Sequence, residues 1–370
     1  QEQLLRIAMV AAGFTGGEAE ELRRAMGFKR SMERMVEIEK RLRSGMTERG
    51  IEAAAQDQIV KSITSFALYG FPESHAASFA LIAYASAYLK ARHPAAFYIA
   101  LLNAWPMGFY HPATLIKDAQ RHGVKVLPID VNQSGWKCRW ENGGVRLGLR
   151  FVKGLRAESG LRVEAAQPFT SAEDLARRAR LRDDQLTKLA YAGALASFGM
   201  TRRAALWQAA YAAKPGGELF DGTARATRSP LPEMSPAETT MADYDSMELT
   251  TGRHLIEHFR PQLKKDGVLT AIELKKVPNG SRVVTAGAVI VRQRPGTAKG
   301  FVFLTLEDET GLSQAIVNPP LFAAERSTIL AHSGLIVEGI VQNQDGQASV
   351  RAERFWPLKG VHEMQSYDFH

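Results

Sequence analysis

The chain has 370 residues, 45% hydrophobic and 23% charged, a composition typical of a soluble globular protein. Its longest apolar run, 76–89, is shorter than the roughly 20 residues of a membrane span, no secretory signal is present, and the single Cys138 excludes an intramolecular disulfide and argues against a cysteine-based zinc site. These features indicate a cytoplasmic protein without a membrane partner, and the net charge of +8 favours a polyanionic partner. The chain begins with Gln1 in a turn that is already helical in pattern, so we expect a piece of a longer protein.

Residues 1–102 are predicted to be helical. The glycine-containing stretch "GFTGG" (13–17) interrupts the first helix, and "EAEELRRAMGFKR" restarts it with acidic residues in the first turn, where the helix dipole favours them. Residues 31–68 predict one or two long amphipathic helices with a break near 45–50.

Adjacent arginines, Arg23 and Arg24, lie in the second helix, and Lys29 follows soon after. Neighbouring helical residues diverge by about 100°, so the two arginines cannot share one outer face, and guanidinium groups suit phosphate oxygens. The alternative is a solvated face paired with Glu20, Glu21 and Glu33. The pattern alone favours that solvated face, because charge runs are usually solvated.

A helix is predicted from about Ser74 to Arg92, with Ser74 as its N-cap and basic residues in its last turn. His75 stands at its mouth, and the pattern leaves open whether it is a capping or surface residue or a contact to a ligand. A stripe of small residues lets another helix or a ligand approach closely; its members are Ala76, Ala80, Ala83 and Ala87.

Extended structure is predicted after residue 123: "VKVLPIDVN" is extended, and "CRWENGGVRLGLRFV" forms a hairpin with its turn at Asn142-Gly143. Residues 153–212 are helical in short pieces. Within this region "FVKGL" (151–155) and "LAYAGALASFG" (189–199) each place a glycine turn between helical pieces. Such pairs are either DNA-binding hairpins that present backbone N–H groups to a phosphate or ordinary helical hairpins.

Residues 213–245 are rich in Pro, Gly, Ser, Thr and Asp and are predicted to be a linker or an extended excursion. "HLIEH" (254–258) matches a zinc-peptidase pattern. We reject a zinc site there because Pro261 ends the helix at once and no acidic helix in proper context supplies a third ligand, and we expect no metal in this chain. A metal hydrolase built on His254 and His258 stays a weak rival.

From residue 281 the hydrophobic period becomes two, and the pattern predicts three strands, a helix and two strands. This is the element order of an OB-fold, a small barrel that often binds single-stranded nucleic acid. Its first hairpin loop carries a basic set predicted to contact DNA: Arg292, Arg294 and Lys299. Phe301 and Phe303 share one strand face and point either into the barrel, which is favoured for at least one ring, or out toward bases.

Three stretches resemble the C-family bacterial DNA polymerases, the alpha-subunit type of DNA polymerase III: "QEQLLRIAMVAAGFTGGEAEELRRAMGFKR", "YGFPESHAASFALIAYASAYLKARHPAAFYIALLN" and "RQRPGTAKGFVFLTLEDETG". The resemblance runs in order along essentially the whole chain. Glu73 stands where the replicative branch carries a basic residue, and "NAWPMGFYHP" and the final "SYDFH" (366–370) are similar to the error-prone, damage-response branch (ImuC-type).

The resemblance implies a multidomain α+β fold, mainly helical and then a β-barrel. Its parts would be the rear of the fingers (1–120), a helix-hairpin-helix region (121–212), a linker and connecting helix (213–264), the OB-fold (265–358) and a C-terminal tail (359–370). The palm would precede Gln1. The resemblance therefore implies that Mg²⁺ is bound outside this chain and that the chain alone is inactive, while the whole protein is an error-prone DNA polymerase of translesion synthesis and DNA repair.

The resemblance also implies site residues. Arg23 and Arg24, with Lys29 nearby, would lie beside the triphosphate of the incoming dNTP, and His75 near its sugar. The first hairpin would contact primer–template DNA through Lys153, Gly154 and Arg156, with Leu155 standing where the family often has a second glycine.

Two protein partners are implied as well: an accessory polymerase-like protein of the damage response and the sliding clamp. "GGELF" (216–220) keeps the apolar end of a clamp peptide but lacks its leading glutamine, so we expect direct clamp binding to be weak or absent. The rival from another class is a non-catalytic nucleic-acid-binding protein that uses the hairpins and the OB-fold alone.

Overall fold

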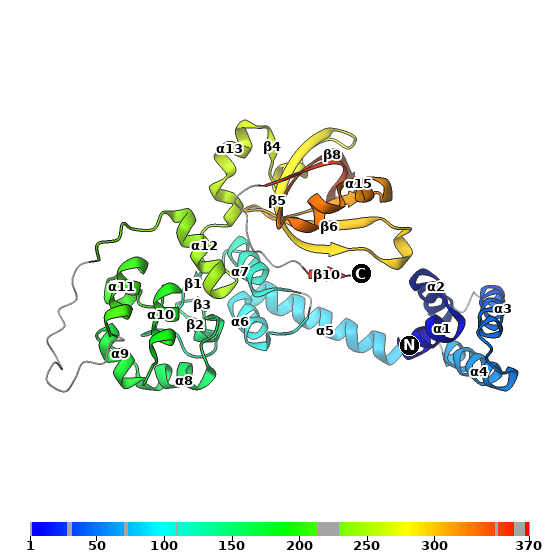
Figure 1. Cartoon of the computed structure of the whole chain (residues 1–370), viewed down its shortest axis with the longest axis horizontal. Coiled ribbons are helices and arrows are strands. Elements are labelled where there is room, and N and C mark those ends of the chain that lie inside the picture. The colour runs from blue at the N-terminus through cyan, green and yellow to red at the C-terminus, as the bar shows by residue number, and fades with distance from the viewer. Residues whose placement is uncertain are drawn as a thin grey trace.

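The computed structural model describes residues 2–27, 32–69, 73–108, 110–212, 229–344, 347–358 and 367–369. A bundle of four helices is followed by one long helix, a second helical region and a β-barrel (Figure 1). The expected α+β class, helical first and barrel last, is confirmed.

The N-terminal bundle consists of α1 (Glu2–Ala12), α2 (Gly16–Gly27), α3 (Met32–Glu48) and α4 (Ala53–Tyr69). It has a core of its own, in which Leu22, Leu42 and Ile63 are almost fully buried. Gly45 lets α3 approach the end of α1, because a Cβ at this position would lie 2.1 Å from the carbonyl oxygen of Ala12. The predicted breaks after α1 and between α3 and α4 are confirmed.

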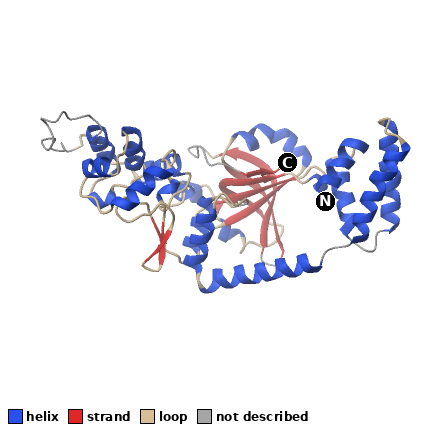
Figure 2. Ribbon diagram, turned by 90° about the horizontal axis from the view of Figure 1, so that it is seen from below, coloured by secondary structure: helices blue, strands red, loops and turns tan. Residues whose placement is uncertain are grey.

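The long helix α5 (Glu73–Arg92) leads from the bundle to α6 (Pro94–Ala104) and α7 (Pro112–Arg121). Figure 2 shows it as a strut along the lower edge of that view, between the two helical regions. Its C-terminal end is fixed by an ion pair of 2.7 Å between Lys90 and Asp118 of α7.

The second helical region opens with a small sheet of β1 (Val126–Leu127), β2 (Arg139–Glu141) and β3 (Gly144–Arg146). The predicted turn is confirmed, because Asn142 and Gly143 both have positive φ, 48° and 80°. The short helices that follow are η1 (Leu149–Phe151), α8 (Ala157–Ala166), α9 (Ala172–Arg178), α10 (Asp183–Tyr191), η2 (Ala196–Phe198) and α11 (Arg202–Ala212).

The structure of the connector to the barrel differs from the prediction. Part of the stretch predicted as a linker is the helix α12 (Pro236–Met247), which starts at a capping box formed by Ser235 and Glu238. Its buried face is partly polar and includes Thr240 and Asp243, so hydrophobic periodicity does not reveal the helix. Residues 213–228 lie outside the described part of the chain. The remaining connector elements are η4 (Leu255–His258), α13 (Arg260–Lys265), β4 (Val268–Leu269) and α14 (Ala271–Leu274).

The barrel has the predicted order of three strands, a helix and two strands: β5 (Arg282–Gln293), β6 (Val302–Glu307), β7 (Leu312–Val317), α15 (Pro319–Ala331), β8 (Gly334–Gln344) and β9 (Gln347–Pro357). The strands pair in the order β5-β6-β7-β9-β8, and β8 pairs back to β5, which closes the barrel. Strands β7 and β9 are parallel, and the other neighbouring pairs in this ring are antiparallel. This is the closed five-stranded topology of an OB-fold.

The barrel and the second helical region share one packed interior. Ala286 and Ala288 of β5 belong to the same buried apolar cluster as Ile116 of α7. Beside this cluster Arg121 of α7 forms an ion pair with Glu307, whose side chain is 1% exposed. The two parts are therefore joined by core packing and by a buried charge pair, not only by the connector.

Candidate nucleotide and nucleic-acid interface

The two arginines of α2 are exposed and share one acidic neighbour. Arg23 donates from Nε to Glu20 over 2.8 Å, while Nε of Arg24 lies 3.9 Å from the same carboxylate. The guanidinium of Arg23 holds the pKa of Glu20 below its usual value. The pairing with Glu20 that the sequence offered as the alternative is therefore present, and the side chains of Arg23 and Arg24 are both exposed to solvent. Lys29 lies outside the described residues.

His75 is exposed in the first turn of α5, at the same end of the molecule as the N-terminal bundle (Figure 1). Its ring makes an edge contact with Phe79 one turn later, with centroids 4.5 Å apart and planes inclined by 62°. Phe79 thus limits the orientations of the imidazole. The expected stripe of alanines continues along the same helix.

The first hairpin of the second helical region turns at Gly154. Gly154 has φ +70°, a left-handed conformation that favours glycine, and leads into α8. Lys153 forms an ion pair of 3.1 Å with Glu248, and Lys188 donates to the carbonyl oxygen of Gly154 over 3.3 Å. Arg156 occupies the N-cap position of α8 and is exposed. The three predicted residues of this hairpin are therefore adjacent, although Lys153 is already paired.

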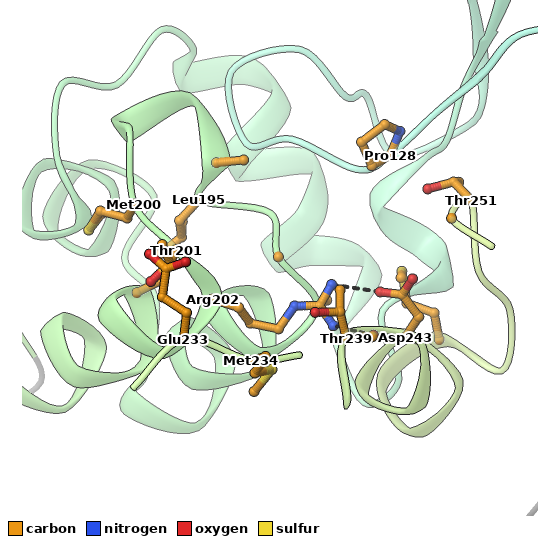
Figure 3. A pocket seen from close by; sticks show the side chains of 16 residues that line it. Pro128, Leu195, Met200, Thr201, Arg202, Glu233, Met234, Thr239, Asp243 and Thr251 are labelled. Atoms are coloured by element: carbon orange, nitrogen blue, oxygen red, sulfur yellow. Dashed lines mark hydrogen bonds and ion pairs between the residues drawn. The ribbon is translucent and has the colours of Figure 1, made fainter. Parts of the chain in front are cut away.

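The second hairpin turns at Gly193, with φ +79°. Beside it lies a cavity of about 360 Å³ between α11 and α12 (Figure 3). Arg202 projects along this cavity, but its guanidinium is bound to Asp243 over 2.6 Å and to the carbonyl oxygen of Thr239 over 3.2 Å. The charge of Arg202 in this cavity is therefore neutralised by Asp243, and this ion pair fixes α12 against the hairpin.

The structure corrects the placement of Arg292. This residue lies in strand β5, not in the loop, and is 8% exposed. Its guanidinium donates to the carbonyl oxygens of Ile329 and His332 at the C-terminal end of α15, over 3.0 and 2.8 Å. There it satisfies carbonyl groups that the helix end leaves unpaired. The physical reason is a β-bulge between Val289 and Val291, which reverses the alternation and turns Arg292 inward.

The loop between β5 and β6 keeps two of the predicted cations. Arg294 lies 5.4 Å from the ring centroid of Phe322, and Lys299 is exposed with φ +49°. The inward side chains of β6 are Val302 and Leu304, so the alternate positions Phe301 and Phe303 belong to the outer face. The interpretation in which at least one ring enters the barrel core is wrong, and both rings share a face with the loop.

This loop also touches the bundle. A Cβ on Gly17, at the start of α2, would lie 3.1 Å from the carbonyl oxygen of Gly296. A Cβ on Gly296 would lie 3.2 Å from the backbone of Gly16 and Gly17. A side chain at either position would require the facing backbone to shift by a few tenths of an ångström, so glycine favours this approach, which places the barrel loop beside the helix that carries Arg23 and Arg24. The sequence pattern identified Gly16 and Gly17 only as part of a helix break and did not predict this contact, because a contact between distant turns leaves no periodic signal.

We expect the basic loop to give salt-dependent binding of a single-stranded oligonucleotide. Arg294→Ala and Lys299→Ala in the whole chain should each lower the slope of log affinity against log salt by about 0.7, the value for one phosphate contact on a single strand. Fluorescence anisotropy at several salt concentrations measures it. The control is Arg326→Ala, an exposed arginine on α15. If both loop variants keep the wild-type slope, residues outside this loop bind the oligonucleotide.

The two histidines of "HLIEH" do not form a metal site. Nδ1 of His254 accepts from the backbone N–H of Ile256 over 3.2 Å, and Nε2 of His258 lies 2.9 Å from the hydroxyl of Thr240. Within the described ranges no group of three or more His, Cys, Asp and Glu side chains could hold a metal ion. The hydrolase rival therefore has no ligand set in the described part of the chain.

His254 gives a prediction about pH. Burial and the nearby Lys117 and Arg121 lower its pKa to about 3. Because the folded protein favours the neutral ring, its contribution to stability is complete above pH 6.5 and is lost as the pH falls toward 3. We expect His254→Gln to reduce the pH dependence of the free energy of unfolding between these limits, measured by urea denaturation. The exposed His332→Gln is the control, and an equal change in both would contradict this assignment.

Three families match the chain in the order of its parts. Residues 1–50 match the bacterial DNA polymerase III alpha subunit finger domain, residues 123–205 a helix-hairpin-helix motif, and residues 283–358 an OB-fold nucleic acid binding domain. An error-prone DNA polymerase of Anaeromyxobacter dehalogenans is 44% identical over 388 aligned positions, which cover 100% of this chain and 34% of that protein. One of Corynebacterium glutamicum is 45% identical over 361 positions, covering 97% of this chain and 34% of that protein. Over its whole length, this chain is similar to a part of the error-prone DNA polymerases.

The resemblance drawn from the three quoted stretches is thereby confirmed, including its error-prone branch. The chain spans about a third of the length of the curated polymerases that it matches. Among solved structures, asparaginyl-tRNA synthetase from Pyrococcus horikoshii is 30% identical over a part that covers 25% of this chain and 23% of that chain, with a TM-score of 0.22, too partial a likeness to bear on function. None of the described helices is long and apolar enough to cross a membrane.

Proposed function

We propose that this chain is the C-terminal part of an error-prone, DNA-directed DNA polymerase that extends primers across damaged template. The observation that carries the proposal is the similarity over the whole chain to polymerases of this name, combined with a finger match, helical hairpins and an OB-fold in one order. We take the domain limits expected from the sequence as part of the proposal: 1–120, 121–212, 213–264, 265–358 and 359–370.

In this proposal the bundle and α5 position the incoming dNTP. Arg23 and Arg24 bind the triphosphate, because exposed guanidinium groups make charge-assisted hydrogen bonds to phosphate oxygens, and Lys29 adds a further charge. His75 lies near the sugar, with its ring orientation limited by Phe79. Nucleotidyl transfer itself uses two metal ions that stabilise the attacking and leaving oxygens. In this proposal Mg²⁺ is held by the part of the polymerase outside this chain; the described residues include no group of three or more His, Cys, Asp or Glu side chains that could hold it.

The second helical region and the barrel grip DNA in this proposal. The left-handed glycine of the first hairpin presents backbone N–H groups to a phosphate, and Lys153 and Arg156 add side-chain charge. The loop with Arg294 and Lys299 holds single-stranded template beside the outward rings of Phe301 and Phe303, on which bases can stack. Arg292 is left out of this surface because it is buried.

The proposed partners are primer–template DNA, dNTP and an accessory polymerase-like protein of the same damage response. The clamp-like stretch 216–220 lies outside the described residues, and the prediction of weak or absent direct clamp binding rests on its sequence alone. Recruitment to DNA would then pass through the accessory protein.

The test is primer extension by the longer protein that contains this chain, on an undamaged template and on one with an abasic site. We expect extension past the lesion, with Mg²⁺ required, while this chain alone binds DNA without extending it. If the longer protein binds DNA as tightly as this chain does but extends no primer, the result would favour the alternative, a non-catalytic nucleic-acid-binding protein.

A further inference from the structure

Large apolar side chains of α5 are exposed to solvent on more than one side of the helix. Leu81 is 70% exposed and Tyr84 74%, although a helix this apolar is normally buried. The other large members of this exposed set are Phe79, Ile82, Tyr88 and Leu89. They lie between positions 79 and 89 of the helix that Figure 2 shows as a free strut.

The exposed residues form two stripes. At about 100° per residue, Phe79, Ile82 and Leu89 fall within about 80° of one another, and Leu81, Tyr84 and Tyr88 fall within about 60°. The centres of the two stripes are about 150° apart around the helix axis, and the alanine stripe lies between them on one side. One flat partner surface cannot cover both stripes. Two surfaces are required, and the alanines let one of them come close to the helix backbone.

The chemistry of α5 identifies the class of partner. From Glu73 to Leu89 the helix carries no lysine or arginine, so neither stripe offers a cation to a phosphate backbone. Its basic residues, Lys90 and Arg92, come in the last turn, and Lys90 is paired with Asp118. A nucleic acid is therefore a poor occupant, whereas two apolar protein surfaces fit.

We propose that α5 is enclosed on both stripes by the part of the polymerase that lies outside this chain. This rests on the proposed function, because the matching polymerases are about three times as long as the segment that aligns with them. The absent polypeptide is thus long enough to supply two surfaces. Enclosure would hold rigid the helix whose first turn carries His75.

Hydrogen exchange of α5 tests the proposal in this chain and in the longer protein. We expect amides of residues 76–89 to exchange on the order of tenfold or more slowly in the longer protein, without DNA or nucleotide. Unchanged exchange would overturn the proposal. Protection that requires added DNA would point to nucleic acid instead, and protection of this chain alone that rises with its concentration, together with dimers in light scattering, would point to a second copy.

Substitutions test the two stripes separately. In this chain Ile82→Lys and Tyr84→Lys should leave the thermal midpoint unchanged, because both side chains are exposed. In the longer protein each should lower the midpoint and restore fast exchange in α5, whereas the control Leu161→Lys, an exposed residue of α8, should do neither. An effect from only one stripe would refute enclosure on both sides. Protection of α5 in a longer protein that extends no primer would refute the proposed function and leave this inference standing.

Discussion

Replacing Arg121 by alanine is expected to lower the free energy of unfolding by about 3–5 kcal/mol, the usual cost of leaving a buried charge without its partner. Arg121 is the cation paired with Glu307, which is 1% exposed at the end of β6. Burial already raises the pKa of Glu307 to about 7 in spite of Arg121 and Lys117. Loss of the guanidinium would leave the carboxyl group in the interior with less charge compensation. Urea denaturation of the chain well above pH 7, where the paired Glu307 is ionised, measures the change.

The matched control is Arg282→Ala, which removes another arginine–glutamate pair from the same barrel. Arg282 is 59% exposed and lies 2.8 Å from Glu338, and exposed pairs contribute at most about 1 kcal/mol. The double variant Arg121→Met with Glu307→Leu should recover most of the lost stability, because it removes both charges and keeps the volume. If Arg121→Ala costs no more than Arg282→Ala, the buried pair does not hold the barrel in place.

Replacing Arg24 by alanine in the longer polymerase is expected to raise the KM for dNTP roughly tenfold to 150-fold, which corresponds to about 1.5–3 kcal/mol for one charge-assisted hydrogen bond. Arg24 is the better single test because Arg23 is held more closely by Glu20, whereas Arg24 lies 3.9 Å from that carboxylate. A contact made only in the transition state would lower kcat instead. Steady-state primer extension with varied dNTP separates the two.

Two variants make this measurement specific. Arg43→Ala removes an exposed arginine of the same bundle that pairs with Glu39 and Asp57, and it should leave the KM unchanged. Glu20→Gln frees the neighbouring Arg23 from its carboxylate and should not raise the KM. Unchanged dNTP kinetics in both Arg23→Ala and Arg24→Ala would remove the triphosphate role from this helix.

The barrel was predictable because the hydrophobic period of its strands is close to two and a helix separates the third strand from the last two. The alternation failed at one point, the bulge after Val289, where a single extra residue reverses the two faces. Arg292 was predicted to lie in the hairpin loop and to contact DNA, whereas β5 extends through it and its guanidinium binds the end of α15. A local irregularity of backbone geometry has no signature in residue types.

The candidate site was predictable only in parts. The left-handed turns at Gly154 and Gly193 follow from the placement of glycine between helical pieces, and the exposure of Arg24 from the charge run. The approach of Gly17 to Gly296 and the pairing of Arg121 with Glu307 join residues 279 and 186 positions apart. Such contacts depend on the final packing of separate elements. The helix α12 was missed because its buried Asp243 is satisfied by Arg202, a partner that no local pattern reveals.

Strand β5 is paired along both of its sides, and this determines how the barrel can meet other chains. On one side it meets β4 at Val284–Thr285 and then β6 from Ala288. On the other it meets β8 up to Ala288 and then the tail strand β10 (Tyr367–Phe369). The short strands β4 and β10 thus cover the two stretches that closure of the barrel leaves open. With part of these backbone groups occupied, β5 offers only short stretches for strand addition, which lowers the tendency of the barrel to edge-to-edge aggregation.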